Sequence, residues 1–482
     1  MESEHQDVVI IGAGLAGVGA AWHLKTLLPQ CRFVILEARG TIGGTWDLFR
    51  YPGIRSDSDM FTLGYRFEPW RNPSAIADGA SIRAYIRDTA DRYDITPHIR
   101  FDSRVTRAEW STPDARWRLH IRGADGTSTQ LTCNFLYTCT GYYDYSAGYM
   151  PEFTGTADFR GRVIHPQQWP DDLDYTGKRV VVIGSGATAV TLVPAMAKSA
   201  SHVTMLQRSP TYMLNRPSRD GFANTLRKLL PERAAYAVTR WKNVLLGIGF
   251  FSMSRKFPAF TRRLLTRGVQ RSLGENFDTQ SHFAPKYDPW DQRLCLVPDS
   301  DLFREMRNGR ASIVTDEIDR FTHSGVLLRS GKELEADIII TATGLVVQLL
   351  GGMDLEVDGE RVEWSKILMY KGMMYSDVPN LASAFGYTNA SWTLKCDLTS
   401  QYVCRLLQVM GEHGYRQCTP RRRDPAMREE PVLDFTSGYV QRALHTLPKQ
   451  GSRAPWRVHQ NYLSDLLTIR NGRIDDGTME FR

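Results

Sequence analysis

The chain has 482 residues, 42% of them hydrophobic and 23% charged, which is ordinary for a globular protein of two or three domains. The net charge of +7 suits a protein that binds polyanionic dinucleotides, and because Lys and Arg are spread along the chain we expect no nucleic-acid partner. The seven cysteines include no CxxC pair, which argues against a disulfide framework and against a metal site.

The N-terminal stretch lacks the positive and apolar regions of a secretory signal. No run of the sequence approaches the roughly 18 apolar residues that a transmembrane helix needs. The sequence therefore predicts a cytoplasmic protein with reduced thiols and without a transmembrane segment.

An apolar strand at 8–11 runs directly into a turn with the pattern GxGxxG at Gly12, Gly14 and Gly17. The first glycine permits a tight turn, the second lets the backbone approach a pyrophosphate, and the third lets a helix pack on the strand. The next strand ends at Glu37, where a carboxylate accepts hydrogen bonds from ribose hydroxyls. These features predict a site for an adenosine dinucleotide without a 2′-phosphate.

The segment after this strand contains two adjacent glycines, and its candidate cofactor contacts are Gly44, Thr45 and Trp46. Glycines allow the backbone to come close to a flavin or to its pyrophosphate. A plain turn is the alternative interpretation of the same residues.

A loop at 159–170 has the spacing FxGxxxHxxxWP without a gap, formed by Phe159, Gly161, His165, Trp169 and Pro170. On composition alone, a lone histidine in such a loop is more often a structural group than a catalyst.

A second strand–turn–helix unit begins at about residue 180 with the pattern GxGxxA, and its candidate contacts are Gly184, Gly186, Thr188 and Ala189. The following strand ends in Arg208 and Ser209, with no acid. A guanidinium and a hydroxyl at this place favour the 2′-phosphate of NADP over a free 2′-hydroxyl. An acid-terminated site followed by an NADP-type site indicates an enzyme that binds FAD and NADPH.

Both units have a late apolar strand that ends in a Thr-Gly turn, at 135–143 and at 337–345. We therefore predict an α/β fold with two Rossmann-like dinucleotide-binding domains and a helical insertion in the second. The predicted FAD domain is 1–145 with 350–482, the NADP domain is 155–211 with 289–349, and the insertion is 212–288.

Two further segments complete the prediction of elements. A helix is predicted at 398–414, where a glycine stops it. The insertion, in which strand signals vanish, contains a basic and aromatic stretch made of Trp241, Lys242, Phe250, Phe251, Arg255, Lys256, Phe257, Arg262 and Arg263. This stretch is either a peripheral membrane face or the wall of a substrate pocket with a solvated outer side, and we favour the wall.

The loop at 159–170 is the fingerprint of Baeyer–Villiger monooxygenases, and its Trp-Pro ending separates them from flavin N- and S-monooxygenases. The chain thus resembles the class B flavoprotein monooxygenases from Val8 to about Leu407. The segments 43–60, 287–303 and 386–398 resemble the subgroup that contains the ethionamide-activating monooxygenase.

The resemblance implies that Arg293 lies over the flavin, where it holds the nicotinamide and stabilises a C4a-peroxyflavin. Its charge partner would be Asp57. The resemblance ties His165 to NADP handling and domain movement rather than to bond-making. A fixed cation of this kind favours an anion that forms beside it.

Asn389, Ser391 and Trp392 are expected near the flavin or the substrate pocket, with plain core packing as the alternative for the tryptophan. Many family members carry Lys immediately before the catalytic arginine, and here Gln292 takes its place. Recognition of the 2′-phosphate then depends more heavily on Arg208 and Ser209.

The predicted activity is an NADPH- and O2-dependent Baeyer–Villiger oxygenation that converts ketones to esters or lactones and thioethers to sulfoxides. A dedicated sulfide S-monooxygenase and an NADPH oxidase or flavin reductase are the alternatives. A disulfide reductase is disfavoured because it needs a redox cysteine pair after its first nucleotide unit, and no cysteine lies between Cys31 and Cys133.

Overall fold

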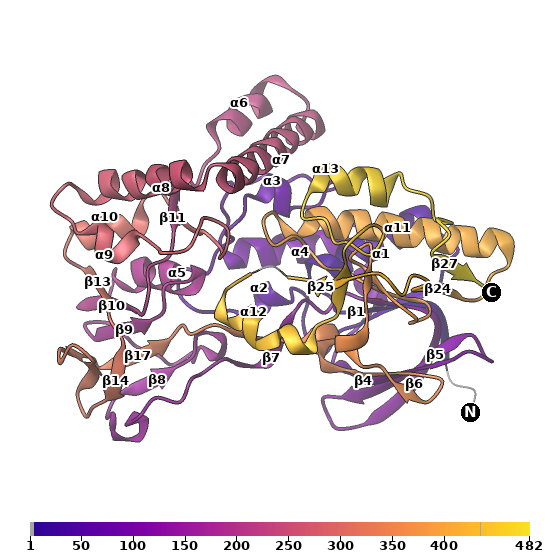
Figure 1. Cartoon of the computed structure of the whole chain (residues 1–482), viewed down its shortest axis with the longest axis horizontal. Coiled ribbons are helices and arrows are strands. Elements are labelled where there is room, and N and C mark those ends of the chain that lie inside the picture. Colours follow the sequence, from indigo (N-terminus) through magenta and orange to yellow (C-terminus); the bar gives the residue numbers. More distant parts are fainter. Residues whose placement is uncertain (1–3, 434) are drawn as a thin grey trace.

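The chain forms two large sheets, and one glycine-rich turn follows a strand of each (Figure 1). The computed structural model describes residues 4–433 and 435–482. The α/β fold with two Rossmann-like units is confirmed. In the described residues no helix is both long enough and apolar enough to cross a membrane.

The first sheet contains β1 (Glu4–Ile11), β2 (Phe33–Leu36), β3 (Ile99–Arg100), β4 (Ser103–Ser111), β5 (Arg116–Gly123), β6 (Ser128–Thr138), β19 (Asp354–Val357), β20 (Glu360–Arg361) and β23 (Leu381–Ser383). Their order is β20-β19-β4-β5-β6-β1-β2-β3, and β23 pairs with β6. The central strand β1 is parallel to β2 and β6. Its Val8 and Ile10 face one core and its Val9 and Ile11 face another, so this strand is covered on both sides.

The second sheet is entirely parallel and contains β8 (Arg162–Ile164), β9 (Arg179–Ile183), β10 (His202–Gln207), β13 (Ala311–Thr315) and β17 (Ile338–Thr341), in the order β13-β10-β9-β17-β8. Helices α5 (Ala187–Met196) and α10 (Asp301–Arg307) lie on one face. A small antiparallel sheet of β14 (Ile318–Phe321), β15 (Gly325–Leu328) and β16 (Glu333–Glu335) covers the other.

Two strands connect the sheets and lie side by side. Strand β7 (Tyr143–Gly148) leads out of the first unit, and β18 (Leu345–Val347) leads back into it. They form an antiparallel pair in which Leu345 lies opposite Gly148. The two crossings therefore form one short ribbon between the units.

The stretch predicted as a helical insertion contains α6 (Gly221–Leu229), α7 (Glu232–Lys256), α8 (Pro258–Leu273) and α9 (Thr279–Phe283). The prediction that it holds no strand is wrong, because β11 (Met213–Arg216) pairs with β12 (Cys295–Pro298). The long helix α7 packs on the first unit, where Arg240 donates to the carbonyls of Phe61 and Gly64 at 2.7 and 2.8 Å.

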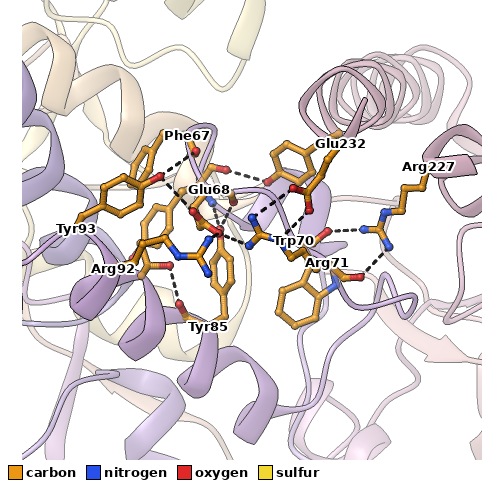
Figure 2. Close-up of polar contacts among 12 residues, drawn as sticks. Phe67, Glu68, Trp70, Arg71, Tyr85, Arg92, Tyr93, Arg227 and Glu232 are labelled. Atoms are coloured by element: carbon orange, nitrogen blue, oxygen red, sulfur yellow. Dashed lines mark hydrogen bonds and ion pairs between the residues drawn. The ribbon is translucent and has the colours of Figure 1, made fainter. Parts of the chain in front are cut away.

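A network around the buried carboxylate of Glu68 also joins the insertion to the first unit (Figure 2). Glu68 pairs with Arg71 and, at 2.8 Å, with Arg92. Arg71 in turn pairs with Glu232, at the start of α7, at 2.8 Å. Arg227 of α6 donates to the carbonyl of Arg71 at 3.1 Å. These contacts fix the helices of the insertion against the loop that holds Glu68.

The predicted helix near the C-terminus is α11 (Trp392–His413), which starts earlier than 398 and ends at the left-handed Gly414. It packs against α1 (Leu15–Leu27) in the first core. Its buried Lys395 pairs with Asp465 at 3.0 Å, which anchors the C-terminal segment.

The remaining α-helices and strands are α2 (Thr45–Leu48), α3 (Met60–Leu63), α4 (Gly79–Arg92), β21 (Met369–Tyr370), β22 (Met374–Tyr375), β24 (Cys418–Pro420), β25 (Glu429–Pro431), α12 (Gly438–Ala443), β26 (Lys449–Gly451), α13 (Tyr462–Asp465) and β27 (Met479–Phe481).

Candidate functional site

The first glycine-rich turn has the shape that a pyrophosphate needs. Gly12 has φ of +103°, and a Cβ there would lie 2.7 Å from the carbonyl oxygen of Cys139. Helix α1 begins after Gly14, and within residues 4–433 and 435–482 its N-cap offers no side-chain hydrogen bond to the first amides. These amides and the positive end of the helix dipole suit an anion.

Glu37 lies immediately after β2 and beside this turn, as predicted. Its carboxylate accepts hydrogen bonds from the amides of Ala13 at 2.7 Å and of Arg39 at 2.9 Å. Burial raises the pKa of Glu37 above its usual value, against the effect of these amides. The residue therefore holds the turn in place as well as offering oxygen lone pairs at the end of the strand.

The segment with Gly44, Thr45 and Trp46 packs on the same turn. The amide of Gly43 donates to the carbonyl of Ala13 at 3.2 Å, and the Thr45 hydroxyl lies 3.4 Å from that of Tyr145. Trp46 packs against the first core. The structure thus brings together the two glycine segments that the sequence assigns to one cofactor.

The second glycine-rich turn repeats the geometry in the other unit. Gly184 has φ of +138°, and a Cβ there would lie 2.3 Å from the carbonyl oxygen of Ala342. Gly186 precedes α5 in open space, and no side chain caps this helix either. Thr188 lies in the first turn of α5, while Ala189 is buried and lets the helix pack on the sheet.

Arg208 and Ser209 directly follow β10, and both are exposed. The Arg208 side chain makes no hydrogen bond or ion pair within residues 4–433 and 435–482. A charged group that is free in this way is available for a phosphate. Both turns, their uncapped helices and these two residues therefore fit two dinucleotide cofactors.

Arg293 and Asp57 form the ion pair that the family resemblance implies. The Nη1 of Arg293 lies 3.2 Å from the Oδ2 of Asp57. Arg293 precedes β12 of the second unit, whereas Asp57 precedes α3 of the first. Tyr142 and Asp57 raise the pKa of the Arg293 guanidinium, so it stays charged.

Two buried donors near this pair have no partner in the described residues, namely Nε of Arg293 and Nε1 of Trp290. Buried polar groups are rarely left unpaired in folded proteins. Nε of Arg293 belongs to the ion pair that joins the units, and Trp290 precedes Arg293 by three residues, so these free donors fit a polar ligand bound there.

The three residues predicted near the flavin or the substrate pocket have different contacts. Trp392 stacks on Tyr142, with ring centroids 4.9 Å apart, and the charge of Arg293 lowers the pKa of that tyrosine against the effect of burial. Ser391 is buried and shares a hydrogen bond of 2.6 Å with Thr62. Asn389 donates to the carbonyl of Gln460 at 2.9 Å, in the C-terminal segment. Of the three, only the tryptophan contacts the surroundings of the ion pair.

His165 is held between the two connecting strands. Its Nε2 lies 3.1 Å from the carbonyl oxygen of Gly344, just before β18, and its Nδ1 accepts from the amide of Gln167 at 3.2 Å. A Cβ on Gly148, at the end of β7, would lie 1.8 Å from the imidazole ring. Burial lowers the pKa of His165, so the neutral ring is favoured.

The other fingerprint residues support this loop. Phe159 packs with Phe321 in the core under the small antiparallel sheet. A Cβ on Gly161 would lie 2.2 Å from the carbonyl oxygen of Asp337. Trp169 packs on the second unit's core, and Pro170 follows it in the chain. The fingerprint thus positions His165 instead of lining the ion pair.

Several residues near the ion pair were not predicted from the sequence. Tyr142 and Tyr143 follow the predicted Thr-Gly turn after β6, and this position in the sequence could have marked them as site residues. Tyr439 of α12 also raises the pKa of Arg293, but no pattern in the sequence marks this tyrosine. Arg55 and Asp301 form a second ion pair between the units, which joins the loop before α3 to α10.

Comparisons with known proteins agree with this arrangement. Residues 72–383, more than half of the chain, match the flavin-binding monooxygenase-like family, and residues 10–70 match an NAD(P)-binding Rossmann-like domain. The FAD-containing monooxygenase EthA of Mycobacterium tuberculosis (strain ATCC 25618 / H37Rv) is 56% identical over 480 residues, which cover 99% of this chain and 98% of that protein.

Two solved structures share the fold over 100% of both chains. OTEMO in complex with FAD and NADP has a TM-score of 0.76 at 21% sequence identity. Cyclohexanone monooxygenase bound to ε-caprolactone has a TM-score of 0.76 at 19% identity. The family match, together with the identity to EthA, leads to one conclusion: this chain belongs to the flavin-binding monooxygenase-like family.

Proposed function

We propose that the chain is an FAD-containing Baeyer–Villiger monooxygenase that uses NADPH and O2. Its products would be esters or lactones from ketones, and sulfoxides from thioethers. The name of EthA supports FAD as the cofactor. The OTEMO complex with FAD and NADP has the same fold, and the free Arg208 supports NADP at the second site.

The observation that carries the proposal is the ion pair of Arg293 with Asp57. It unites the NADP unit with the FAD unit at a point where buried donors lack partners. FAD supplies the activation of O2 when it is bound and reduced. Arg293 contributes a fixed positive charge that favours anions formed beside it, and Asp57 orients the guanidinium.

The aromatic surroundings of Arg293 suit an apolar substrate with one polar group. Trp392 and Tyr142 form one stack, and Phe251 of α7 lies 5.4 Å from Trp290 between ring centroids. A pocket with aromatic sides and few polar groups is typical for small organic ligands. We propose that these rings contribute to the binding site of the ketone or thioether.

Replacing Arg293 tests the proposal. Arg293→Ala should keep FAD bound but lower the yield of oxygenated product per NADPH by about 10²–10³, because a preorganised charge contributes about that factor. The missing product should appear as hydrogen peroxide. Mass spectrometry with cyclic ketones, aryl ketones and aryl sulfides, together with a peroxide assay, measures both quantities.

The matched control is Arg255→Ala, which removes a neighbouring arginine that pairs with Asp291 at 2.7 Å. It should leave the product yield close to that of the wild type. Full product yield from Arg293→Ala would overturn the role of this residue. Peroxide without any product from the wild type would favour an NADPH oxidase.

A further inference from the structure

The helices of the insertion expose apolar side chains to solvent. On α7, Trp241 is 43% exposed, Leu245 53% and Leu246 62%. Residues three, four and seven apart lie on one side of a helix, so Val238, Trp241 and Leu245 form one stripe. The neighbouring helices add further exposed apolar residues, which are Phe222, Leu229, Leu230, Phe257, Phe260 and Leu264. We call these residues of α6, α7 and α8 the helical face.

The helical face continues onto the C-terminal segment. Trp241 lies 6.0 Å from Tyr462 of α13 between ring centroids. Leu463 and Leu467, in and just after this helix, are 39% and 69% exposed. Figure 1 shows α8, α7, α6 and α13 along the upper edge of the molecule.

The opposite side of α7 is firmly held, so the exposed stripe is not a loose helix. Arg240 is buried and donates to the backbone carbonyls of Phe61 in α3 and of Gly64 just after it, and Asn243 donates to Asp59 at 2.8 Å. The pair of Glu232 with Arg71 fixes the start of the helix (Figure 2). Within the stretch that we predicted as a pocket wall with a solvated outer side, Trp241 and Phe257 are exposed and so lie on the outer side.

The charge of this region is strongly one-sided. Between residues 221 and 273 there are eleven Lys and Arg but only one acidic residue, Glu232, which pairs with Arg71. Three of these cations pair with acids just outside this range, namely Lys242 with Asp220, Arg255 with Asp291 and Arg262 with Asp288, so the excess positive charge comes from the others. On α8 the exposed Arg263 and Arg267 lie beside the exposed Leu264. They line an open pocket of about 500 Å³ together with Arg262, Thr266, Gln280, Ala284, Pro285 and Lys286.

We propose that the helical face docks on the surface of an anionic phospholipid bilayer. Helices with Trp, Phe and Leu on one side, rimmed by Lys and Arg, lie in the membrane interface and bind by apolar burial plus attraction to anionic lipids. A second copy of the chain would bring the same positive charge to the contact, so self-association through this face is opposed. The pocket between α8 and α9 takes the phosphate of a lipid headgroup.

Vesicle co-sedimentation of the full-length holoenzyme tests the proposal. The probes are vesicles of phosphatidylcholine alone and vesicles of phosphatidylcholine with phosphatidylglycerol. The apolar variant is Leu245→Glu with Leu246→Glu, and the charge variant is Arg263→Gln with Arg267→Gln. Bound flavin absorbance and thermal unfolding show that each variant is folded.

Each variant has a matched control outside the helical face. Leu27→Glu changes another exposed leucine, 49% exposed at the end of α1. Arg104→Gln with Arg122→Gln removes two exposed arginines that lie opposite each other on β4 and β5. Both controls should bind vesicles as the wild type does.

The wild type should sediment with the anionic vesicles and much less with the neutral ones. Binding of the charge variant should fall about tenfold or more, because each basic residue near an anionic surface adds about fivefold in affinity. Binding of the apolar variant should fall at least as much, because it loses apolar burial and adds two negative charges that the anionic surface repels. Equal binding of the wild type and of these two variants would overturn the proposal. A wild-type dimer that Leu245→Glu with Leu246→Glu dissociates in sedimentation velocity would overturn it as well.

Discussion

Glu37 and Arg208 occupy equivalent places at the residue scale, since each directly follows the second strand of its nucleotide unit. Glu37 is buried and accepts hydrogen bonds from two backbone amides, so its carboxylate is held in one position. Arg208 is exposed and has no partner in the described residues. A fixed carboxylate suits ribose hydroxyls, whereas a free guanidinium suits a phosphate dianion.

This contrast predicts the cofactor preference of an Arg208→Ala variant. The KM for NADPH should rise about tenfold to a hundredfold, because a hydrogen bond to a charged group contributes about 1.5–3 kcal/mol. The KM for NADH should change little, because NADH has no 2′-phosphate. Steady-state kinetics with both nucleotides measure this, with the exposed Arg160→Ala as control. An equal rise in both values would contradict the assignment.

At the scale of elements, the ribbon of β7 and β18 joins the two units, and His165 is packed between its strands. The neutral imidazole uses both nitrogens, one toward Gly344 and the other toward the amide of Gln167. A proton on Nδ1 would point at the amide N–H of Gln167, which is itself a donor. Protonation therefore works against this contact.

The lowered pKa of His165 gives a pH prediction. A histidine whose pKa is lower in the folded state than the ordinary 6.5 contributes stability above that pH and loses it as the pH falls below it. His165→Gln should have a lower Tm than the wild type at pH 7.5, and the difference should shrink at pH 5.5. Differential scanning fluorimetry measures it, with the exposed His445→Gln as control. A difference that grows toward pH 5.5 would refute the role of the neutral ring.

Several elements could be predicted because their signals are local. The glycine turns at Gly12 and Gly184 depend on a few adjacent residues, and both have the positive φ that the pattern requires. Strand β11 could not be predicted, because its four residues alternate weakly and gain their pairing only from β12. Tyr439 comes to Arg293 from the far end of the chain, and no spacing in the sequence reports such a contact.

At the scale of the whole molecule, the contacts between the units gather around the candidate site. The pairs of Asp57 with Arg293 and of Arg55 with Asp301 both cross from the loop before α3 to the second unit. Gly53 in the same loop lies against α5, where a Cβ would be 2.7 Å from that of Ala195. A site assembled from two units depends on the relative position of these units.

We propose that this molecule transfers one oxygen atom from O2 to an organic substrate with electrons from NADPH. The most direct measurement is the mass of the product formed under ¹⁸O2 from a cyclic ketone and from an aryl thioether. We predict one ¹⁸O atom in each ester, lactone or sulfoxide, and one product molecule for each NADPH consumed. Unlabelled product, or NADPH consumption that yields only hydrogen peroxide with every substrate, would contradict the claim.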